Sequence, residues 1–365
     1  MANWIALSDH DGHWFAPQGL GQPKGAAKLV QSGPDALMVR GSLVVETNVP
    51  ATARMEPLFI YDQQGEWPLH LALHAIPGGG LSLVLNQGGL PLHQTINHSE
   101  GGRTETLRIT YAWDAPRRWA RLTVERPQDD CVISVPVSSP RPLRVMDARA
   151  LLMPGPERYV SREVRYLALS AGIEPIGPMP SLAMDTPIAT PDGYRPISKL
   201  RRGDVVLTQN DCAVPILHKI SRVVPARGSF RPVRLRAPFF GLWRDIDVSP
   251  AQRLLLTGSE VEYLFGCQAV LLSTRHLTGT PRAYIPPVGQ LITYQQLVLP
   301  GHEAMKVAGT MADSLFIGRL RRNRDVLSRS LLADLDRNSL PEHAKPVHPV
   351  LRAFDATILA ERRVA

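Results

Sequence analysis

The sequence predicts a mainly β protein, built from two β domains and a short C-terminal helical tail. The chain has 365 residues, more than one domain usually holds, so two domains are expected. Its 28 glycines and 33 prolines mark frequent turns. Between these turns, short apolar segments alternate with polar residues, which is typical of strands that have one buried face.

The N-terminal domain is expected over residues 1–165. Alternation with period 2 recurs there, with Gly and Pro between the segments, as in an antiparallel β-sandwich. The clearest predicted strands are Ser42–Thr47, Leu81–Leu85, Thr106–Tyr111 and Trp119–Glu125. Their order resembles a jelly roll of the concanavalin or laminin-G type. Trp67 and Trp113 are candidates to stack on a sugar in a lectin-like groove, although tryptophan in a sandwich also serves as a core residue.

Residues 166–180 are predicted to be a linker. The stretch Gly172–Pro180 is rich in proline and glycine. Because proline fixes φ and removes a backbone donor, little regular structure is expected there. The segment before it, Ser161–Leu169, is ambiguous between a short helix and a strand.

After residue 318 the pattern changes to helical spacing. Leu327, Leu331 and Leu335 recur at every fourth position, which places them on one helix face, and Asn323 is a candidate N-cap. A second amphipathic piece follows. We therefore predict a basic helical tail over residues 319–365, with two short helices packed on the preceding domain. A tail that binds a partner is the alternative.

The formal net charge of +8 and the pI near 9.7 are compatible with a soft affinity for anionic surfaces. The arginines are scattered, and their main cluster is Arg319–Arg324. No zinc-finger, homeodomain or RNA-binding motif accompanies this cluster, so specific nucleic-acid binding is not expected. Nonspecific nucleic-acid binding by the tail stays an alternative.

The three cysteines, Cys131, Cys212 and Cys267, are too few and too widely spaced for a disulfide framework or a metal site. Ligand spacing is also lacking among other residues of metal-binding type, namely Asp9–His13, His70, His74, His93 and His98. No metal or cofactor is therefore predicted. The N-terminus has no signal-peptide pattern, and no apolar run approaches the roughly 20 residues that span a bilayer. We expect cytoplasmic residence, with secretion by a signal-less route as the alternative.

The most informative stretch is residues 181–208, SLAMDTPIATPDGYRPISKLRRGDVVLT. An extended apolar segment leads into a Pro-Asp-Gly turn, then into Leu-Arg-Arg-Gly-Asp and a Val-Val-Leu strand. This pattern resembles the opening block of bacterial Hint domains, the hedgehog/intein family of self-cleaving β folds. Two later segments resemble further blocks of that family, DVSPAQRLLLTG at 247–258 and TYQQLVLPGHEAMKVAGTMADSLFIG at 293–318. The resemblance implies an all-β Hint-type domain over residues 181–318.

The resemblance also implies a reaction at the Pro180–Ser181 peptide bond. In the family, the first residue of the opening block is normally a cysteine that attacks the peptide bond on its N-terminal side. Ser181 stands there in this chain, and its protonated hydroxyl depends on a neighbouring base. Gln252 occupies the position of the second-block histidine, and an amide cannot exchange a proton near neutral pH. His302 stands where the family places a histidine, and it is the remaining candidate base.

The closing block lacks the penultimate His and terminal Asn of inteins, because Met311–Ser314 stands there, so splicing is not expected. The leading hypothesis is a degenerate autoprocessing protein, with a weak or absent N–O acyl shift at Pro180–Ser181. Ser181 and His302 are its candidate catalytic residues, and purely structural roles for both stay open. The alternative is a carbohydrate- or surface-binding protein, in which the sandwich binds the ligand and the Hint-type domain is a non-catalytic scaffold.

Overall fold

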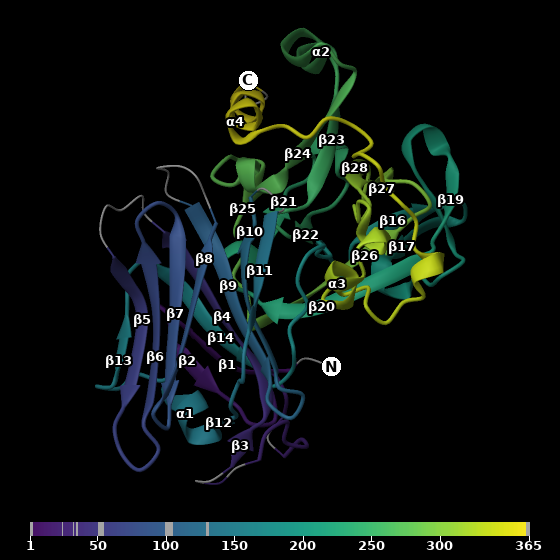
Figure 1. Ribbon diagram of the computed structural model, residues 1–365. Coiled ribbons are helices and arrows are strands. Elements are labelled where there is room, and N and C mark those ends of the chain that lie inside the picture. Colours follow the sequence, from purple (N-terminus) through teal and green to yellow (C-terminus); the bar gives the residue numbers. More distant parts are fainter. Residues whose placement is uncertain are drawn as a thin grey trace. The chain divides into compact units, whose positions relative to one another are not determined.

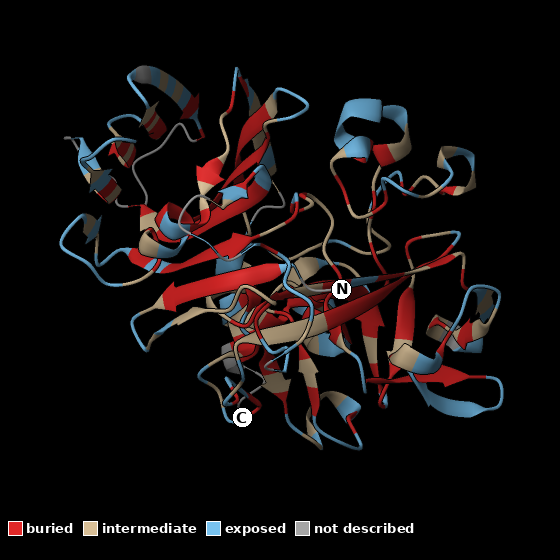
Figure 2. Ribbon diagram, turned by 90° about the horizontal axis from the view of Figure 1, so that it is seen from below, coloured by how far each residue is buried: buried red, intermediate tan, exposed pale blue. Residues whose placement is uncertain are grey.

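The chain folds into two compact units, Met1–Glu174 and Pro175–Ala365 (Figure 1). The computed structural model describes residues 3–23, 25–31, 33, 36–49, 55–98, 105–128 and 131–362. Strands dominate both units, and helices are short and few, so the predicted mainly β fold class is confirmed. Figure 2 shows most strands as buried and most connecting loops as exposed.

The first unit is an antiparallel β-sandwich. Its elements are β1 Trp4–Asp9, β2 His13–Phe15, β3 Leu37–Met38, β4 Arg40–Val49, β5 Glu56–Gln63, β6 Leu69–Ile76, β7 Gly80–Gln87, β8 Leu90–Asn97, β9 Glu105–Asp114, β10 Trp119–Arg126, β11 Cys131–Val137, β12 Leu143–Arg144, α1 Val145–Ala150, β13 Arg158–Val160 and β14 Val164–Ser170. Within the described residues, seven strands form one sheet in the order β11-β10-β9-β4-β14-β1-β2. Five more form the second sheet in the order β13-β5-β6-β7-β8, again among described residues.

The alternation read from the sequence explains this sandwich. Successive side chains of a strand point to opposite faces, so every second residue of β9 enters the core, namely Leu107, Ile109, Tyr111 and Trp113. Strand β6 of the other sheet contributes Leu69, Leu71, Leu73 and Ala75 in the same way. The two inner faces meet in one apolar cluster, as expected of packed sheets.

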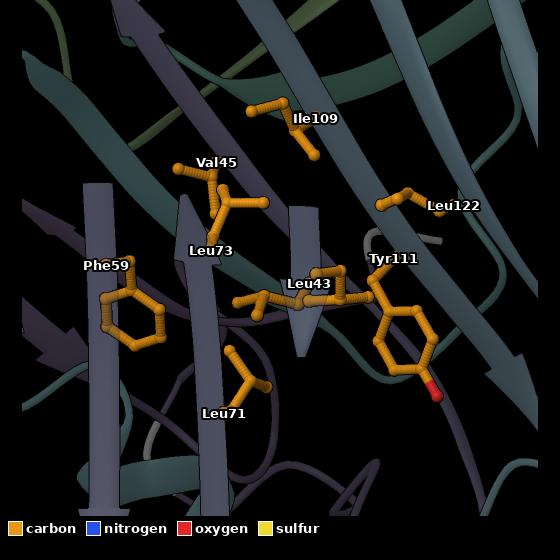
Figure 3. Close-up of a pocket in the computed structure, with 9 residues that line it drawn as sticks. Leu43, Val45, Phe59, Leu71, Leu73, Ile109, Tyr111 and Leu122 are labelled. Carbon is orange, nitrogen blue, oxygen red and sulfur yellow. The ribbon is translucent and has the colours of Figure 1, made fainter. Parts of the chain in front are cut away.

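A small apolar pocket lies inside this core (Figure 3). It is lined by Leu43, Val45, Phe59, Leu71, Leu73, Leu83, Ile109, Tyr111 and Leu122. The hydroxyl of Tyr111 is the one polar side-chain group among them, and it has no hydrogen-bond partner among the described residues. Burial raises the pKa of Tyr111, so the phenol stays neutral. The pocket therefore suits no charged or strongly polar ligand.

The second unit contains two larger sheets and one short hairpin. Its strands are β15 Leu182–Ala183, β16 Pro187–Thr190, β17 Gly193–Pro196, β18 Val205–Leu207, β19 Ala213–Pro215, β20 His218–Pro225, β21 Val233–Leu235, β22 Ile246–Val248, β23 Arg253–Thr257, β24 Ala269–Ser273, β25 Ala283–Tyr284, β26 Leu291–Val298, β27 Ala304–Val307 and β28 Thr310–Asp313. Its α-helices are α2 Ser259–Phe265, α3 Arg324–Ser328 and α4 Ala353–Arg362. Its 3₁₀ turns are η1 Ile197–Lys199, η2 Gln209–Asp211, η3 Gly228–Phe230, η4 Phe239–Gly241, η5 Thr274–Leu277, η6 Leu320–Arg322 and η7 Arg337–Ser339.

The strand order of the second unit brings distant segments together. In residues 175–362, all of which are described, one six-stranded sheet has the order β20-β26-β15-β22-β21-β25. The other has the order β17-β16-β27-β28-β23-β24, and β18 pairs with β19, within the same residues. The turn predicted from Pro-Asp-Gly joins β16 to β17, with Gly193 at φ 107°, a value that favours glycine. The short strand β15 lies between β26 and β22, in the middle of its sheet.

The boundary between the units differs from the predicted linker of residues 166–180. Residues 164–170 form β14, which pairs with both β1 and β4 inside the sandwich. The sandwich therefore extends beyond the predicted end at residue 165. The ambiguity at Ser161–Leu169 is decided by these long-range partners, because pairing on two sides stabilises a strand that local sequence does not distinguish from a helix.

The tail after residue 318 also differs from the prediction. Helix α3 ends at Ser328, so Leu331 and Leu335 lie outside it, although Leu327 and both of these leucines pack in one cluster. The predicted N-cap is present, because the Asn323 side chain accepts a hydrogen bond from the Val326 N–H at 3.1 Å. Helix α4 buries Ala356, Leu359 and Ala360 in the main core of the unit. In the part of the chain that the structure describes, none of the helices has the length and hydrophobicity that a bilayer crossing requires.

The pocket in the sandwich yields a stability prediction. Replacing Tyr111 by Phe removes a buried hydroxyl that has no hydrogen-bond partner, so the free energy of unfolding should stay unchanged or rise by up to about 1 kcal/mol. The matched control is Tyr61→Phe, since the Tyr61 hydroxyl donates to Gln63 Oε1 at 3.1 Å. The control should lose about 1 kcal/mol in urea unfolding. A Tyr111→Phe protein less stable than the control would contradict the unpaired state of this hydroxyl.

Candidate functional site

Ser181 lies directly before β15, at the centre of its sheet. Leu182 pairs with Val248 of β22 on one side and with Gln295 of β26 on the other. The carbonyl oxygen of Ser181 accepts a hydrogen bond from the Ser249 N–H at 2.7 Å. Ser181 is 6% exposed, and Pro180 before it is also buried. The peptide bond of the predicted reaction is therefore inside the fold.

Gln252 reaches Ser181 because of a tight turn after β22. The backbone N–H of Gln252 donates to the Ser249 carbonyl oxygen at 2.9 Å, which turns the chain from β22 towards β23. Its side chain is 1% exposed. The Ser181 hydroxyl donates to Gln252 Oε1 at 2.6 Å. The structure thus brings together the two residues that the sequence placed at the first-block and second-block positions.

Two further residues belong to this site, and the sequence analysis did not single them out. Gln296 of β26 donates through Nε2 to Ser181 Oγ, to Gln252 Oε1 and to the Asp313 carbonyl oxygen, each at 3.0 Å. Asp313 at the end of β28 accepts through Oδ1 from Gln252 Nε2 at 2.6 Å. Gln296 is 1% exposed and Asp313 is 6% exposed. A sequence signal that could have found Gln296 is the pair of adjacent glutamines in the strand segment TYQQLVL, since one of two neighbouring strand residues faces the interior.

The Asp313 carboxylate sets the direction of the hydrogen bonds. An ionised carboxylate only accepts, so the amide group of Gln252 must turn its Nε2 towards Asp313 and its Oε1 towards Ser181. The Ser181 proton is therefore held by an amide oxygen, which is no base at neutral pH. The lone pair of Ser181 Oγ accepts from Gln296 Nε2. Among the described residues, the side chains hydrogen-bonded to the Ser181 hydroxyl are thus two amides, Gln252 and Gln296.

His302 lies in the loop between β26 and β27, and it contacts Asp313 on the side away from the amides. Its Nε2 is 3.4 Å from Asp313 Oδ2, and its Nδ1 accepts a hydrogen bond from the Val347 N–H at 2.9 Å. Within the described residues no hydrogen bond joins His302 to Ser181. Because Nδ1 is an acceptor, the ring is neutral and its proton is on Nε2, facing the carboxylate. The sequence left open whether His302 approaches Ser181, and in the structure both ring nitrogens of His302 face other groups, Asp313 and Val347.

His343 and Phe316 pack beside His302. The ring centroids of His302 and Phe316 are 5.2 Å apart, and those of His302 and His343 are 6.0 Å apart. His343 Nδ1 accepts from the Ile317 N–H at 3.3 Å, and its Nε2 lies 3.2 Å from the Leu299 carbonyl oxygen. Burial lowers the pKa of His343, and the neighbouring His302 lowers it further. The lowered pKa favours the neutral form of the His343 ring.

The tryptophans predicted to bind a glycan have different environments. Trp113 is 1% exposed, and its indole N–H donates to the Met38 carbonyl oxygen at 3.1 Å. Its ring stacks on that of Tyr111, with the ring centroids 5.6 Å apart. The binding role predicted for Trp113 is therefore wrong, because strand alternation directs it into the sandwich core. Trp67 is 61% exposed. It stays a candidate contact for a ligand of the sandwich.

The tail arginines are partly neutralised inside the second unit. Arg321 and Arg322 both contact the Glu342 carboxylate, at 2.7 and 2.6 Å. These contacts lower the pKa of the Glu342 carboxyl group to about 2. The largest cause is the hydrogen bond from Arg322, and the next is the hydrogen bond from Arg321. Among the residues of described placement, no group of three His, Cys, Asp or Glu side chains is arranged to hold a metal ion.

Comparison with known proteins gives one family match. Residues 180–319 match the model of a family described as the Hint domain. No curated protein matches the chain.

Several solved structures are similar to parts of the chain at low identity and low TM-score. The MchDnaB-1 intein is 14% identical, with 36% of this chain and 98% of that chain covered and a TM-score of 0.24. The Msm DnaB1 intein splicing domain bound with zinc is 16% identical, with 36% and 98% covered and a TM-score of 0.23. Sheep galectin-11 in complex with glycerol is 10% identical, with 36% and 82% covered and a TM-score of 0.22.

The amide network predicts that Gln296 is important for stability. Replacing Gln296 by Leu removes the donor shared by Ser181, Gln252 and Asp313, so the free energy of unfolding should fall by about 2–3 kcal/mol. Gln295 is the matched control, since it lies on the same strand, is 8% exposed, and its Oε1 has no hydrogen-bond partner among described residues. Gln295→Leu should cost less than about 1 kcal/mol. Equal losses in urea unfolding would contradict a structural role of the network.

The lowered pKa of His343 leads us to predict that the stability of the protein depends on pH. The pKa of His343 in the folded protein is below the usual value, so between about pH 6.5 and this lower pKa the unfolded chain binds a proton that the folded protein does not. Stability should therefore fall as pH decreases through this window, by at most about 1.4 kcal/mol per pH unit from this residue. Above the window His343 contributes no pH dependence. Urea unfolding at pH 7.5 and pH 5.5 should show a smaller difference for His343→Gln than for the wild type, and identical differences would refute the prediction.

Proposed function

Because residues 180–319 form a Hint domain, we propose that this protein is a Hint-domain protein whose autoprocessing reaction is arrested at Pro180–Ser181. The hydrogen bond of 2.6 Å from the Ser181 hydroxyl to Gln252 Oε1 is the observation that carries the proposal. The reaction of this family needs a nucleophile that loses its proton and an acid that protonates the leaving nitrogen. In this proposal Ser181 stands at the position of the nucleophile and Gln252 at the position of the acid. Their side chains hydrogen-bond to each other instead of reacting.

The energetic argument rests on the proton. A thiol leaves a few per cent thiolate at neutral pH, while a serine hydroxyl has to pass its proton to a base during the attack. Its hydrogen-bond acceptor here is an amide oxygen, and the nearest imidazole, His302, is directed at Asp313 and Val347. Loss of a positioned acid–base group alone typically removes about 10²–10⁴ of the rate. The exchange of sulfur for oxygen adds to this loss.

The same contacts support a structural role for the domain. Glutamine offers a donor and an acceptor in place of an imidazole, so the buried polar atoms stay paired although acid–base chemistry is not supplied. Gln252 uses both, towards Asp313 and Ser181. The Hint domain then serves as a scaffold that presents the rest of the chain, and the glycan- or surface-binding alternative assigns that presented function to the sandwich with Trp67.

The proposal predicts the outcome of a cleavage assay. Purified wild-type protein should stay intact with hydroxylamine or dithiothreitol, because no ester forms at Pro180–Ser181. The double variant Ser181→Cys, Gln252→His supplies a thiol and an imidazole at the two positions. It should yield fragments 1–180 and 181–365, measured by intact-mass spectrometry.

The controls separate arrest from a wrong assignment of the site. Each single variant should cleave at least about 10²-fold more slowly than the double variant, since each lacks one of the two groups. Wild-type protein that yields the two fragments, together with an intact Ser181→Ala protein, would falsify the arrest. If the double variant is folded but stays intact, the cause of the arrest is not at these two residues.

A further inference from the structure

Residues 343–351, the sequence HAKPVHPVL, lie beyond the family match, yet they are bound to the Hint domain along their length. We call this segment the strap. The His343 N–H donates to the Gly318 carbonyl oxygen at 2.9 Å. Further along, the Leu271 N–H donates to the Pro349 carbonyl oxygen at 2.8 Å, and the Leu351 N–H donates to the Leu271 carbonyl oxygen at 2.9 Å. The strap thus pairs with β24 in parallel, through Val350 and Leu271.

The strap is also packed against apolar side chains. Val347 and Val350 contact a buried cluster formed by Leu255, Ala269, Leu271 and Ala304. Helix α4 follows the strap, and the Ala360 carbonyl oxygen accepts from Arg282 Nη1 at 2.8 Å. The strap is therefore held at both ends by buried contacts of the same unit. Such a segment stays in place unless several contacts open together.

One contact of the strap concerns the chemistry of the site. The Val347 N–H donates to His302 Nδ1 at 2.9 Å, while His302 Nε2 faces Asp313 Oδ2 at 3.4 Å. In catalytic His–Asp pairs, one ring nitrogen faces the carboxylate and the other accepts the proton of the nucleophile. Here His302 Nε2 faces the carboxylate at ion-pair distance, without a hydrogen bond among the described residues. The second nitrogen, Nδ1, accepts from a backbone amide, which does not give up its proton near neutral pH.

We infer that the strap is an intramolecular cap, which holds His302 in its neutral Nε2–H form and withholds its basic nitrogen from reaction. The His302 side chain is 1% exposed, Phe316 and the strap residue His343 lie against its ring, and the Val347 N–H of the strap occupies Nδ1. Opening the strap exposes a His–Asp pair that is already assembled. This inference concerns the state of one imidazole, and it stands whether or not the Hint domain cleaves itself.

The test uses full-length protein and the acylation of histidine by diethylpyrocarbonate, which attacks a ring nitrogen that carries no proton. In the wild type His302 should be protected relative to the exposed His10, with sites and rates read by peptide mass spectrometry. Val347→Pro removes the N–H donor. It should speed the acylation of His302 about tenfold, which corresponds to about 1.4 kcal/mol less protection. ¹⁵N NMR of the ring should report Nδ1 as an unprotonated acceptor in the wild type.

Two variants keep the test sharp. Ala344→Pro places the same substitution at an exposed strap residue whose N–H makes no backbone hydrogen bond among described residues, and it should leave His302 protected. Val347→Ala trims the side chain but keeps the N–H, so it should also protect His302. Near-ultraviolet circular dichroism confirms that each variant is folded. The inference is overturned if a folded Val347→Pro protein protects His302 as the wild type does, or if Val347→Ala exposes it equally.

Discussion

A single buried carboxylate, that of Asp313, organises the polar centre of the second unit. Its Oδ1 accepts from Gln252 Nε2 and from the Arg253 N–H, and its Oδ2 faces His302. A carboxylate that only accepts fixes which atom of the Gln252 amide it meets. It thereby fixes the atom that Ser181 meets on the other side. The orientation of the Gln252 amide follows from this one group.

Burial explains why the four polar side chains of this network need one another. A polar group in an apolar interior costs free energy unless it is hydrogen-bonded, and removing one partner leaves the others unpaired. Ser181, Gln252, Gln296 and Asp313 lie at the meeting point of strands from both six-stranded sheets. A change at one of them therefore affects the packing of several strands. In the proposed arrest, the hydrogen bonds that stabilise the site are also the ones that keep the Ser181 hydroxyl from reacting.

The sandwich follows a simpler rule. Its strands have apolar residues at every second position, and those residues meet in one core whatever the local turns are. Trp113 obeys this rule and is buried, while Trp67 lies between strands and is exposed. Strand alternation was enough to predict this outcome for Trp113. Residue type left both a core and a binding role open for Trp113, and its position along the strand decides for the core.

The short C-terminal helices show a similar effect of tertiary contacts. The spacing of Leu327, Leu331 and Leu335 fits one continuous helix, but the chain leaves the helix at Ser328. All three leucines still pack in the same cluster, because turns of another kind bring them there. A five-residue helix gains little from its own hydrogen bonds, so packing decides where it ends.

The sequence by itself determined the mainly β class, the strand periods of the sandwich and the likeness of the second half of the chain to the Hint domain. These features depend on local pattern or on order along the chain. Only the tertiary structure decided that β14 belongs to the sandwich and that Gln296 and Asp313 join the site. It also decided that the Val347 N–H donates to His302 Nδ1. These pairings join residues far apart in the sequence, and their geometry is set by which strands lie side by side in the sheets, an arrangement that no local pattern specifies.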